Sequence, residues 1–139
     1  MKTLFIDTSG WVAVVNRRDQ HYEMAKDFYR QAFKNYAVFL TTNLVVAETY
    51  ILLRTDCGWA TASAWWEKIT ASDKVKIVYA DPNATFDAFT LLQKYSDHPF
   101  SLTDAVSFVL MGQLKIQDAF AFDNHFTIAG FQRFPMAGL

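Results

Sequence analysis

Two aspartates each follow a short apolar run, one near either end of the chain. Asp7 comes directly after residues 3–6 (Thr-Leu-Phe-Ile), and Asp123 comes directly after residues 119–122 (Ala-Phe-Ala-Phe). Runs of this kind are typical of buried strands, and the aspartate marks where each strand leaves the core. Ligands of open α/β sheets bind at the carboxyl ends of the strands. We therefore expect both aspartates to contribute to one site.

Two further acids, Glu48 and Asp104, lie on predicted helices. The neighbours of Glu48 at three and four residues are all apolar, which predicts that this carboxylate faces inward. A lone buried carboxylate is costly unless it has a partner or a function. Asp104 completes a capping-box pattern with Ser101, so a capping role and a functional role are equally open for it.

These four acids would repel one another if folding brought them together. A hard divalent cation such as Mg²⁺ or Mn²⁺ would remove that repulsion, because it prefers oxygen ligands. Such an ion can neutralise a phosphate, lower the pKa of water and stabilise a leaving oxygen, which predicts phosphodiester hydrolysis with one or two ions. Hydroxyls that could support the site, or simply cap helices, are those of Thr8, Ser9 and Thr103.

The elements that must position these acids are strands and helices, which alternate along the chain. Besides the two strands before the aspartates, strands are predicted at residues 38–41, 75–79 and 131–134, with helical patterns between them. This alternation predicts an α/β fold with a parallel sheet that helices cover on both faces. The length of 139 residues fits a single domain, 1–139.

Composition narrows the classes of function. The net charge of −1 and the pI of about 6.3 exclude a broad basic surface for nucleic acid. Cys57 is the only cysteine, so no internal disulfide can form, which fits a reducing cytoplasm. No apolar stretch approaches the roughly 18 residues of a membrane span. The aromatic share of 17% can serve the core or a partner surface.

Other chemistries have little support in the sequence. There is no Gly-rich phosphate loop and no paired-cysteine metal site. His21, His98 and His125 share no metal-ligand spacing, and we predict packing or capping roles for His21 and His125. Cys57 is predicted to be a small buried hydrophobe rather than a nucleophile.

Four motifs, in order along the chain, resemble the PIN-domain family, and most of all its VapC-type toxins from prokaryotic toxin–antitoxin pairs. The motifs are Phe5-Ile6-Asp7-Thr8-Ser9, Val46-Ala47-Glu48, Ser101-Leu102-Thr103-Asp104-Ala105 and Phe120-Ala121-Phe122-Asp123-Asn124-His125-Phe126. The resemblance covers almost the whole chain. It implies a PIN-like α/β fold with a mostly parallel sheet of about five strands, and a cytoplasmic Mg²⁺- or Mn²⁺-dependent endoribonuclease.

The resemblance also implies roles for individual residues. Asp7 and Asp104 would be the principal metal ligands, and Glu48 and Asp123 would complete the site. Partners implied by the resemblance are an RNA substrate, a second copy of the chain in a homodimer, and a cognate antitoxin that lies in an apolar groove. Supporting hydroxyls would come from Thr8 and Thr103. Tryptophans that could line that groove, or equally the core, are Trp11, Trp59, Trp65 and Trp66.

Two alternatives to a nuclease remain open from the sequence. The first is phosphotransfer with Asp7 as the nucleophile, which normally needs a lysine near the acids, and no lysine follows the late strands at a suggestive position. The second is a non-catalytic binding module in which the acids only cap helices. Basic residues that could guide RNA, or form an ordinary solvated face, are Arg17, Arg18, Lys26, Arg30 and Lys34.

Overall fold

The chain forms a five-stranded parallel sheet, which a computed structural model describes over residues 2–136. The order across the sheet is β3-β2-β1-β4-β5, and every neighbouring pair is parallel. The strands are β1 (Lys2–Ile6), β2 (Tyr36–Thr42), β3 (Val75–Val78), β4 (Asp118–Phe120) and β5 (Gln132–Phe134). This confirms the predicted α/β class with a parallel sheet of about five strands.

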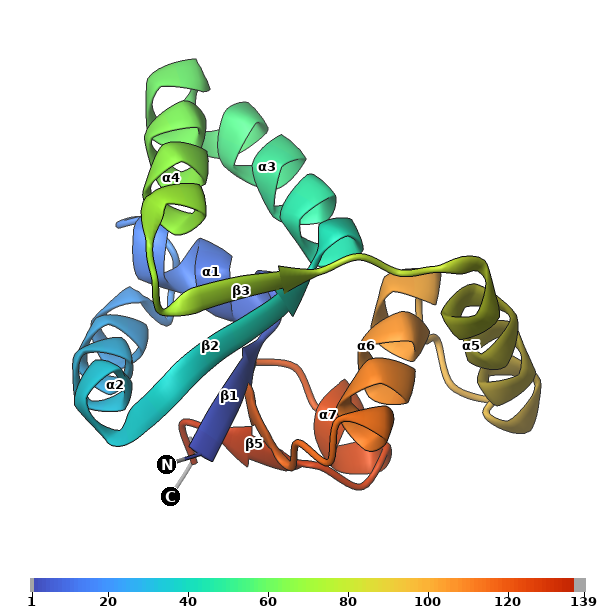
Figure 1. Cartoon of the computed structure of the whole chain (residues 1–139). Coiled ribbons are helices and arrows are strands. Elements are labelled where there is room, and N and C mark those ends of the chain that lie inside the picture. Colours follow the sequence, from blue (N-terminus) through green and yellow to red (C-terminus); the bar gives the residue numbers. More distant parts are fainter. Residues whose placement is uncertain (1, 137–139) are drawn as a thin grey trace.

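Helices cover both faces of this sheet. They are α1 (Thr8–Val15), α2 (Tyr22–Asn35), α3 (Asn43–Cys57), α4 (Trp59–Ala71), α5 (Pro82–Lys94), α6 (Leu102–Gln113) and α7 (His125–Ile128). Figure 1 shows α1 and α2 on one side and α6 and α7 on the other, while the α3–α4 pair and α5 project as two arms. Within residues 2–136, no helix is long and apolar enough to cross a membrane.

The direction in which the chain adds strands reverses around β1. From β1 it moves outward through β2 to β3, and it then returns to pair β4 with the opposite side of β1. A reversal of this kind separates the segments that follow the two central strands and leaves room for a ligand at their carboxyl ends. Asp7 directly follows β1, so it lies at this point of the sheet.

The predicted end of the fourth strand is wrong by two residues. The prediction placed the strand at residues 119–122 with Asp123 at its end, whereas β4 ends at Phe120. The backbone N–H of Phe122 donates to the Ser9 hydroxyl instead of a neighbouring strand, at 3.0 Å. Asp123 therefore lies in the loop between β4 and α7.

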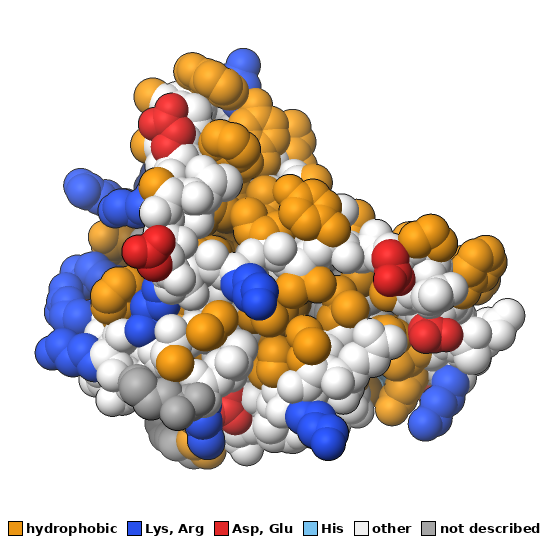
Figure 2. Space-filling model, in the orientation of Figure 1, with side chains coloured by type: hydrophobic (Ala, Val, Ile, Leu, Met, Phe, Trp, Pro, Cys, Tyr) orange, Lys and Arg blue, Asp and Glu red, His pale blue; other side chains and the backbone are white. Residues whose placement is uncertain are grey.

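The aromatic residues divide between the core and the surface. Phe5, Phe39, Phe120 and Phe126 are fully buried. The core also holds Trp11 and Trp65, whose rings meet edge to face with centroids 5.8 Å apart. The other two tryptophans, Trp59 and Trp66, are at least half exposed, together with Phe33, Tyr79, Phe86 and Phe89. Figure 2 shows hydrophobic side chains gathered in the hollow between the two arms.

Candidate functional site

The first acid of the site, Asp7, forms the junction between β1 and α1. It has extended backbone angles, and its carboxylate caps α1 by accepting a hydrogen bond from the backbone N–H of Ser9. Its Oδ2 atom also accepts a hydrogen bond from the Ser9 hydroxyl at 3.0 Å. The residue is only 4% exposed. Capping alone would leave a carboxylate at a wet helix end, so this degree of burial needs another explanation.

Close packing joins the start of α1 to the loop that carries Asp123. A Cβ atom added to Gly10 would lie 2.6 Å from the carbonyl oxygen of Phe120, so only glycine allows this approach. The Ser9 hydroxyl both donates to Asp7 and accepts from the backbone N–H of Phe122. The segment after β4 is therefore tied directly to the helix that follows β1.

Asp104 lies in the first turn of α6 and completes the predicted capping box. Its backbone N–H donates to the Ser101 hydroxyl, and its Oδ2 atom accepts from the Ser101 N–H, each at 3.0 Å. The same Oδ2 atom lies 3.0 Å from Nδ1 of His125. The two readings of Asp104 are thus not exclusive, because one residue caps the helix and also presents a buried carboxylate to a neighbouring segment.

The prediction that Glu48 faces the interior is wrong. Glu48 is exposed on α3, and the apolar neighbours Ile51 and Leu52 on its face are also exposed. The reason is that α3 belongs to a projecting arm, so its apolar residues are not all covered by the body of the protein. Glu48 reaches the site from the rim.

The four predicted acids nevertheless line one cavity of about 400 Å³. They come from the β1–α1 junction, α3, α6 and the loop before α7. Neither lysine nor arginine is among the described lining residues. We call this the acid cavity; its lining includes Asp7, Thr8, Ser9, Asp19, His21, Glu48, Asp104, Phe122, Asp123 and His125.

Crowding of carboxylates changes the ionisation of Asp7. Burial, and to a smaller extent the nearby charges of Asp123 and Asp104, together raise the pKa of its carboxyl from 3.8 to about 7. Hydrogen bonds from Ser9 and the backbone of Thr8 oppose this rise. The cavity therefore holds more negative charge than its own groups can compensate.

The donor atoms of the acid cavity fit a hard cation. The Thr8 hydroxyl is buried, lines the cavity and has no hydrogen-bond partner within residues 2–136. The other donors are carboxylate oxygens, which Mg²⁺ and Mn²⁺ prefer. In the described part of the chain, no three or more His, Cys, Asp or Glu side chains form a ready-made metal cluster. An ion held here would therefore retain water molecules, as Mg²⁺ usually does.

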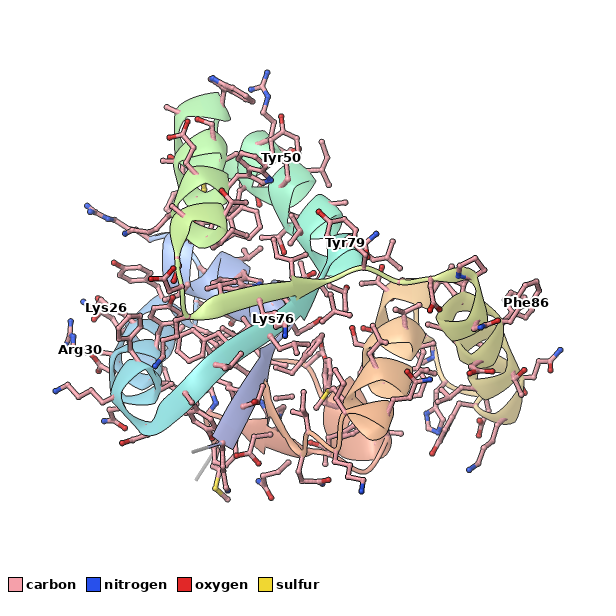
Figure 3. All side chains as sticks on the ribbon, in the orientation of Figure 1. Lys26, Arg30, Tyr50, Lys76, Tyr79 and Phe86 are labelled. Atoms are coloured by element: carbon pink, nitrogen blue, oxygen red, sulfur yellow. The ribbon has the colours of Figure 1, made fainter. Side chains whose placement is uncertain are left out.

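Several other predicted residues lie outside this site. Thr103 does not line the acid cavity, and its carbonyl accepts a hydrogen bond from Ser107. Lys26 and Arg30 project from the outer side of α2 and lie near acids of the same helix, Glu23 and Asp27 (Figure 3). These contacts match an ordinary solvated helix face.

Residues that the sequence did not mark as functional also line the cavity, among them His125, Asp19 and His21. His125 contacts Asp104, although a packing or capping role was predicted for it. Asp19 accepts a hydrogen bond from the backbone N–H of His21, whose ring stacks on Phe122 with centroids 4.4 Å apart. The signals available for His125 were its position two residues after Asp123 and its place in the last of the four family-like motifs, because its partner Asp104 is distant along the chain.

Known proteins share both the sequence and the fold. The model of the PIN domain matches residues 4–132. The 23S rRNA-specific endonuclease VapC20 of Mycobacterium tuberculosis is 34% identical over 128 residues, which cover 92% of this chain and 95% of the relative.

Solved structures agree with this assignment. The crystal structure of Mycobacterium tuberculosis VapC20, described as a sarcin–ricin loop cleaving toxin, matches with a TM-score of 0.85 and 33% identity, and it covers 92% of this chain and 95% of that one. PAE2754 from Pyrobaculum aerophilum matches with a TM-score of 0.67 at 14% identity over 95% of this chain and 89% of that one, a likeness of fold alone. The chain therefore belongs to the PIN domain family.

Proposed function

We propose that this protein is a divalent-metal-dependent endoribonuclease that hydrolyses RNA phosphodiester bonds at the acid cavity. The observation that carries the proposal is the convergence of four acids from separate segments on a cavity whose described lining has no lysine or arginine. That composition disfavours phosphotransfer to Asp7, which would need a lysine beside the acids. It favours a bound cation as the group that neutralises the charge of the phosphate.

Within this proposal, Asp7 and Asp104 hold Mg²⁺ or Mn²⁺, and Glu48 and Asp123 complete the site. The bound ion supplies charge neutralisation at the phosphate, a lowered pKa for water and stabilisation of the leaving oxygen. Glu48 and Asp123 are less buried than the two ligands and can accept hydrogen bonds from water at the cavity mouth. Thr8 supplies a supporting hydroxyl, whereas Thr103 keeps that role only through the family resemblance.

The substrate proposed for this chain is a loop of 23S ribosomal RNA, as the name and the structure of the VapC20 relative state for that protein. A loop is a suitable target because its unstacked bases can reach aromatic side chains. The stacked rings of His21 and Phe122 provide such a surface in the wall of the acid cavity. Arg17 and Arg18 are exposed in the segment just before Asp19, and we propose them as contacts for flanking phosphates, although the Arg18 guanidinium donates to the carbonyl of Asp56 in the free protein.

We further propose that the protein acts in the cytoplasm as the toxin of a toxin–antitoxin pair. A groove of about 470 Å³ between α1, α2 and α4 is lined by Trp11, Tyr29, Phe33 and Trp65. The ammonium group of Lys74 lies 4.8 Å from the centre of the Phe33 ring, so the apolar groove has a basic edge. An amphipathic antitoxin segment with acidic flanks would fit this surface. Trp11 and Trp65 would then serve the core and the groove together.

A second apolar cavity, of about 540 Å³, is the proposed contact between two copies of the chain. It lies beside α3, α4 and the end of β3, and Trp59 and Trp66 line it. Figure 3 places Tyr50 and Tyr79 in this region and Phe86 on the α5 arm. Exposed aromatic residues on both arms would be covered in a symmetric homodimer.

Removal of divalent ions is expected to stop RNA cleavage. Purified protein treated with a chelator should leave a 23S rRNA fragment intact, and added Mg²⁺ or Mn²⁺ should restore cutting, because no lysine or arginine among the described lining residues could neutralise the phosphate instead. Gel analysis of end-labelled RNA measures both states. Undiminished cleavage in the chelator would contradict the metal-dependent mechanism.

The two proposed interfaces can be separated by a pair of variants. Phe33→Asp should weaken antitoxin binding at least tenfold and leave the dimer intact, because it places a charge in the α1–α2–α4 groove. Tyr79→Asp should shift the protein towards monomer and leave antitoxin affinity within about twofold. Calorimetry with the antitoxin and sedimentation of the free protein measure the two effects. Each variant is the control for the other, and the opposite pattern would reverse the assignment.

A further inference from the structure

We propose that His125 is a positioning residue that orients Asp104 and Asp123 for the metal ion. The inference rests on the proposed function, because it assigns these two acids to the ion. Nothing in the spacing of the histidines predicts this role. It follows from the contacts that His125 makes with two separate segments of the acid cavity.

The contact with Asp104 fixes which carboxylate oxygen remains free. Oδ2 of Asp104 lies 3.0 Å from Nδ1 of His125 and also accepts from the Ser101 N–H. An ionised carboxylate can only accept, so Nδ1 must carry the hydrogen in this pair. Within residues 2–136 no hydrogen bond reaches Oδ1 of Asp104, which leaves that oxygen for the ion. Protein hydrogen bonds to one oxygen of a ligating carboxylate are a common way of orienting the other.

The contact with Asp123 involves the same residue through its backbone. The N–H of His125 donates to Oδ1 of Asp123 at 3.0 Å, and the ring nitrogen Nδ1 lies 3.8 Å from that oxygen. His125 thus holds one acid from α6 and one from the loop before α7 in a fixed relation. The two carboxylates would otherwise depend on separate elements for their orientation.

The imidazole ring is itself held in place. The Phe100 ring contacts it at a steep angle, with centroids 5.3 Å apart. The next residue, Phe126, is fully buried and anchors the start of α7 in the core. A packing role alone would need only an apolar ring at position 125. A positioning role needs a donor at Nδ1, so substitutions can distinguish the two roles.

The test compares three variants by calorimetric titration with Mn²⁺ alone, without RNA. His125→Ala should weaken Mn²⁺ binding by about 10- to 100-fold, the usual effect of removing an outer-shell partner. His125→Asn should recover most of that loss, because its amide nitrogen occupies the place of Nδ1. His125→Phe keeps the ring against Phe100 but has no donor, so it should bind Mn²⁺ as weakly as the alanine variant.

A matched control is His21→Ala, which removes another histidine of the cavity whose ring makes no hydrogen bond to an acid in the described part of the chain. It should bind Mn²⁺ as the wild type does. Rescue by phenylalanine instead of asparagine, or unchanged binding by the alanine variant, would overturn the positioning role and leave the nuclease proposal standing. A wild-type protein that takes up no Mn²⁺ would overturn both.

Discussion

Asp104→Asn is expected to reduce RNA cleavage by about a thousandfold at saturating Mn²⁺. The substitution removes a ligand charge from the acid cavity while retaining a side chain that can still cap α6. A bound cation stabilises the transition state of phosphate hydrolysis by several kcal/mol, and each 1.4 kcal/mol corresponds to a factor of ten in rate. The measurement is the initial rate of cutting of a 23S rRNA fragment that contains the sarcin–ricin loop.

The matched control for this variant is Asp19→Asn. Asp19 lines the same cavity, and its carboxylate accepts a hydrogen bond from the His21 backbone, which an asparagine can also accept. The same change of charge at this position should alter the rate by less than about tenfold, because Asp19 is outside the proposed ligand set. Equal rates for the wild type and Asp104→Asn would remove Asp104 from the catalytic site.

The sequence was sufficient to predict the parallel sheet and the meeting of two distant aspartates at one of its edges. Most of the strands contain a short apolar run, and parallel strands place their carboxyl ends at one edge. β1 and β4 are indeed neighbours, with Leu4 paired to Asp118. The aspartates that follow them therefore reach one cavity, although they lie far apart along the chain.

Features that depend on how the helices pack could not be predicted from the sequence pattern in the same way. Helical periodicity indicates an apolar face but not what covers it, and the face of α3 that carries Glu48, Ile51 and Leu52 stays exposed. His125 presents a similar difficulty, because its hydrogen bond to Asp104 joins two elements and leaves no spacing pattern. Periodic patterns report contacts within an element, whereas both of these residues depend on contacts between elements.

Asp7→Asn is expected to stabilise the metal-free protein at neutral and alkaline pH, even though it should inactivate the enzyme. The folded state raises the pKa of Asp7 to about 7 from 3.8, so folding favours the protonated form. Well below pH 3.8 the carboxyl is neutral in both folded and unfolded chains and the penalty disappears, and at pH 4 the penalty is still below about 1 kcal/mol. As the pH rises towards 7, the unfolded chain ionises more readily, and the folded state progressively loses stability.

The size of this loss of folding stability follows from the shift in the pKa of Asp7. Each pKa unit corresponds to about 1.4 kcal/mol, so a shift of about three units gives an upper value of about 4 kcal/mol at pH 8. Asparagine carries no charge and is as good a helix cap as aspartate. In a chelating buffer, Asp7→Asn should therefore melt about 10 °C above the wild type at pH 8, but no more than about 3 °C above it at pH 4.

Adding Mn²⁺ at pH 8 should close most of the gap between the two melting temperatures. The wild type gains about 2.7 kcal/mol when the ion is present at a hundred times its dissociation constant, which offsets more than half of the penalty of about 4 kcal/mol, whereas Asp7→Asn lacks a principal ligand and gains little. Thermal unfolding with and without Mn²⁺ at pH 4 and pH 8 measures all four states, with Asp19→Asn as the control for a general change of charge. Equal melting temperatures at pH 8 in the chelator would show that Asp7 carries no electrostatic penalty. In that case the main reason for placing a cation beside it would be lost. The expected narrowing would show that the carboxylate which destabilises the empty fold is also a group that binds the ion.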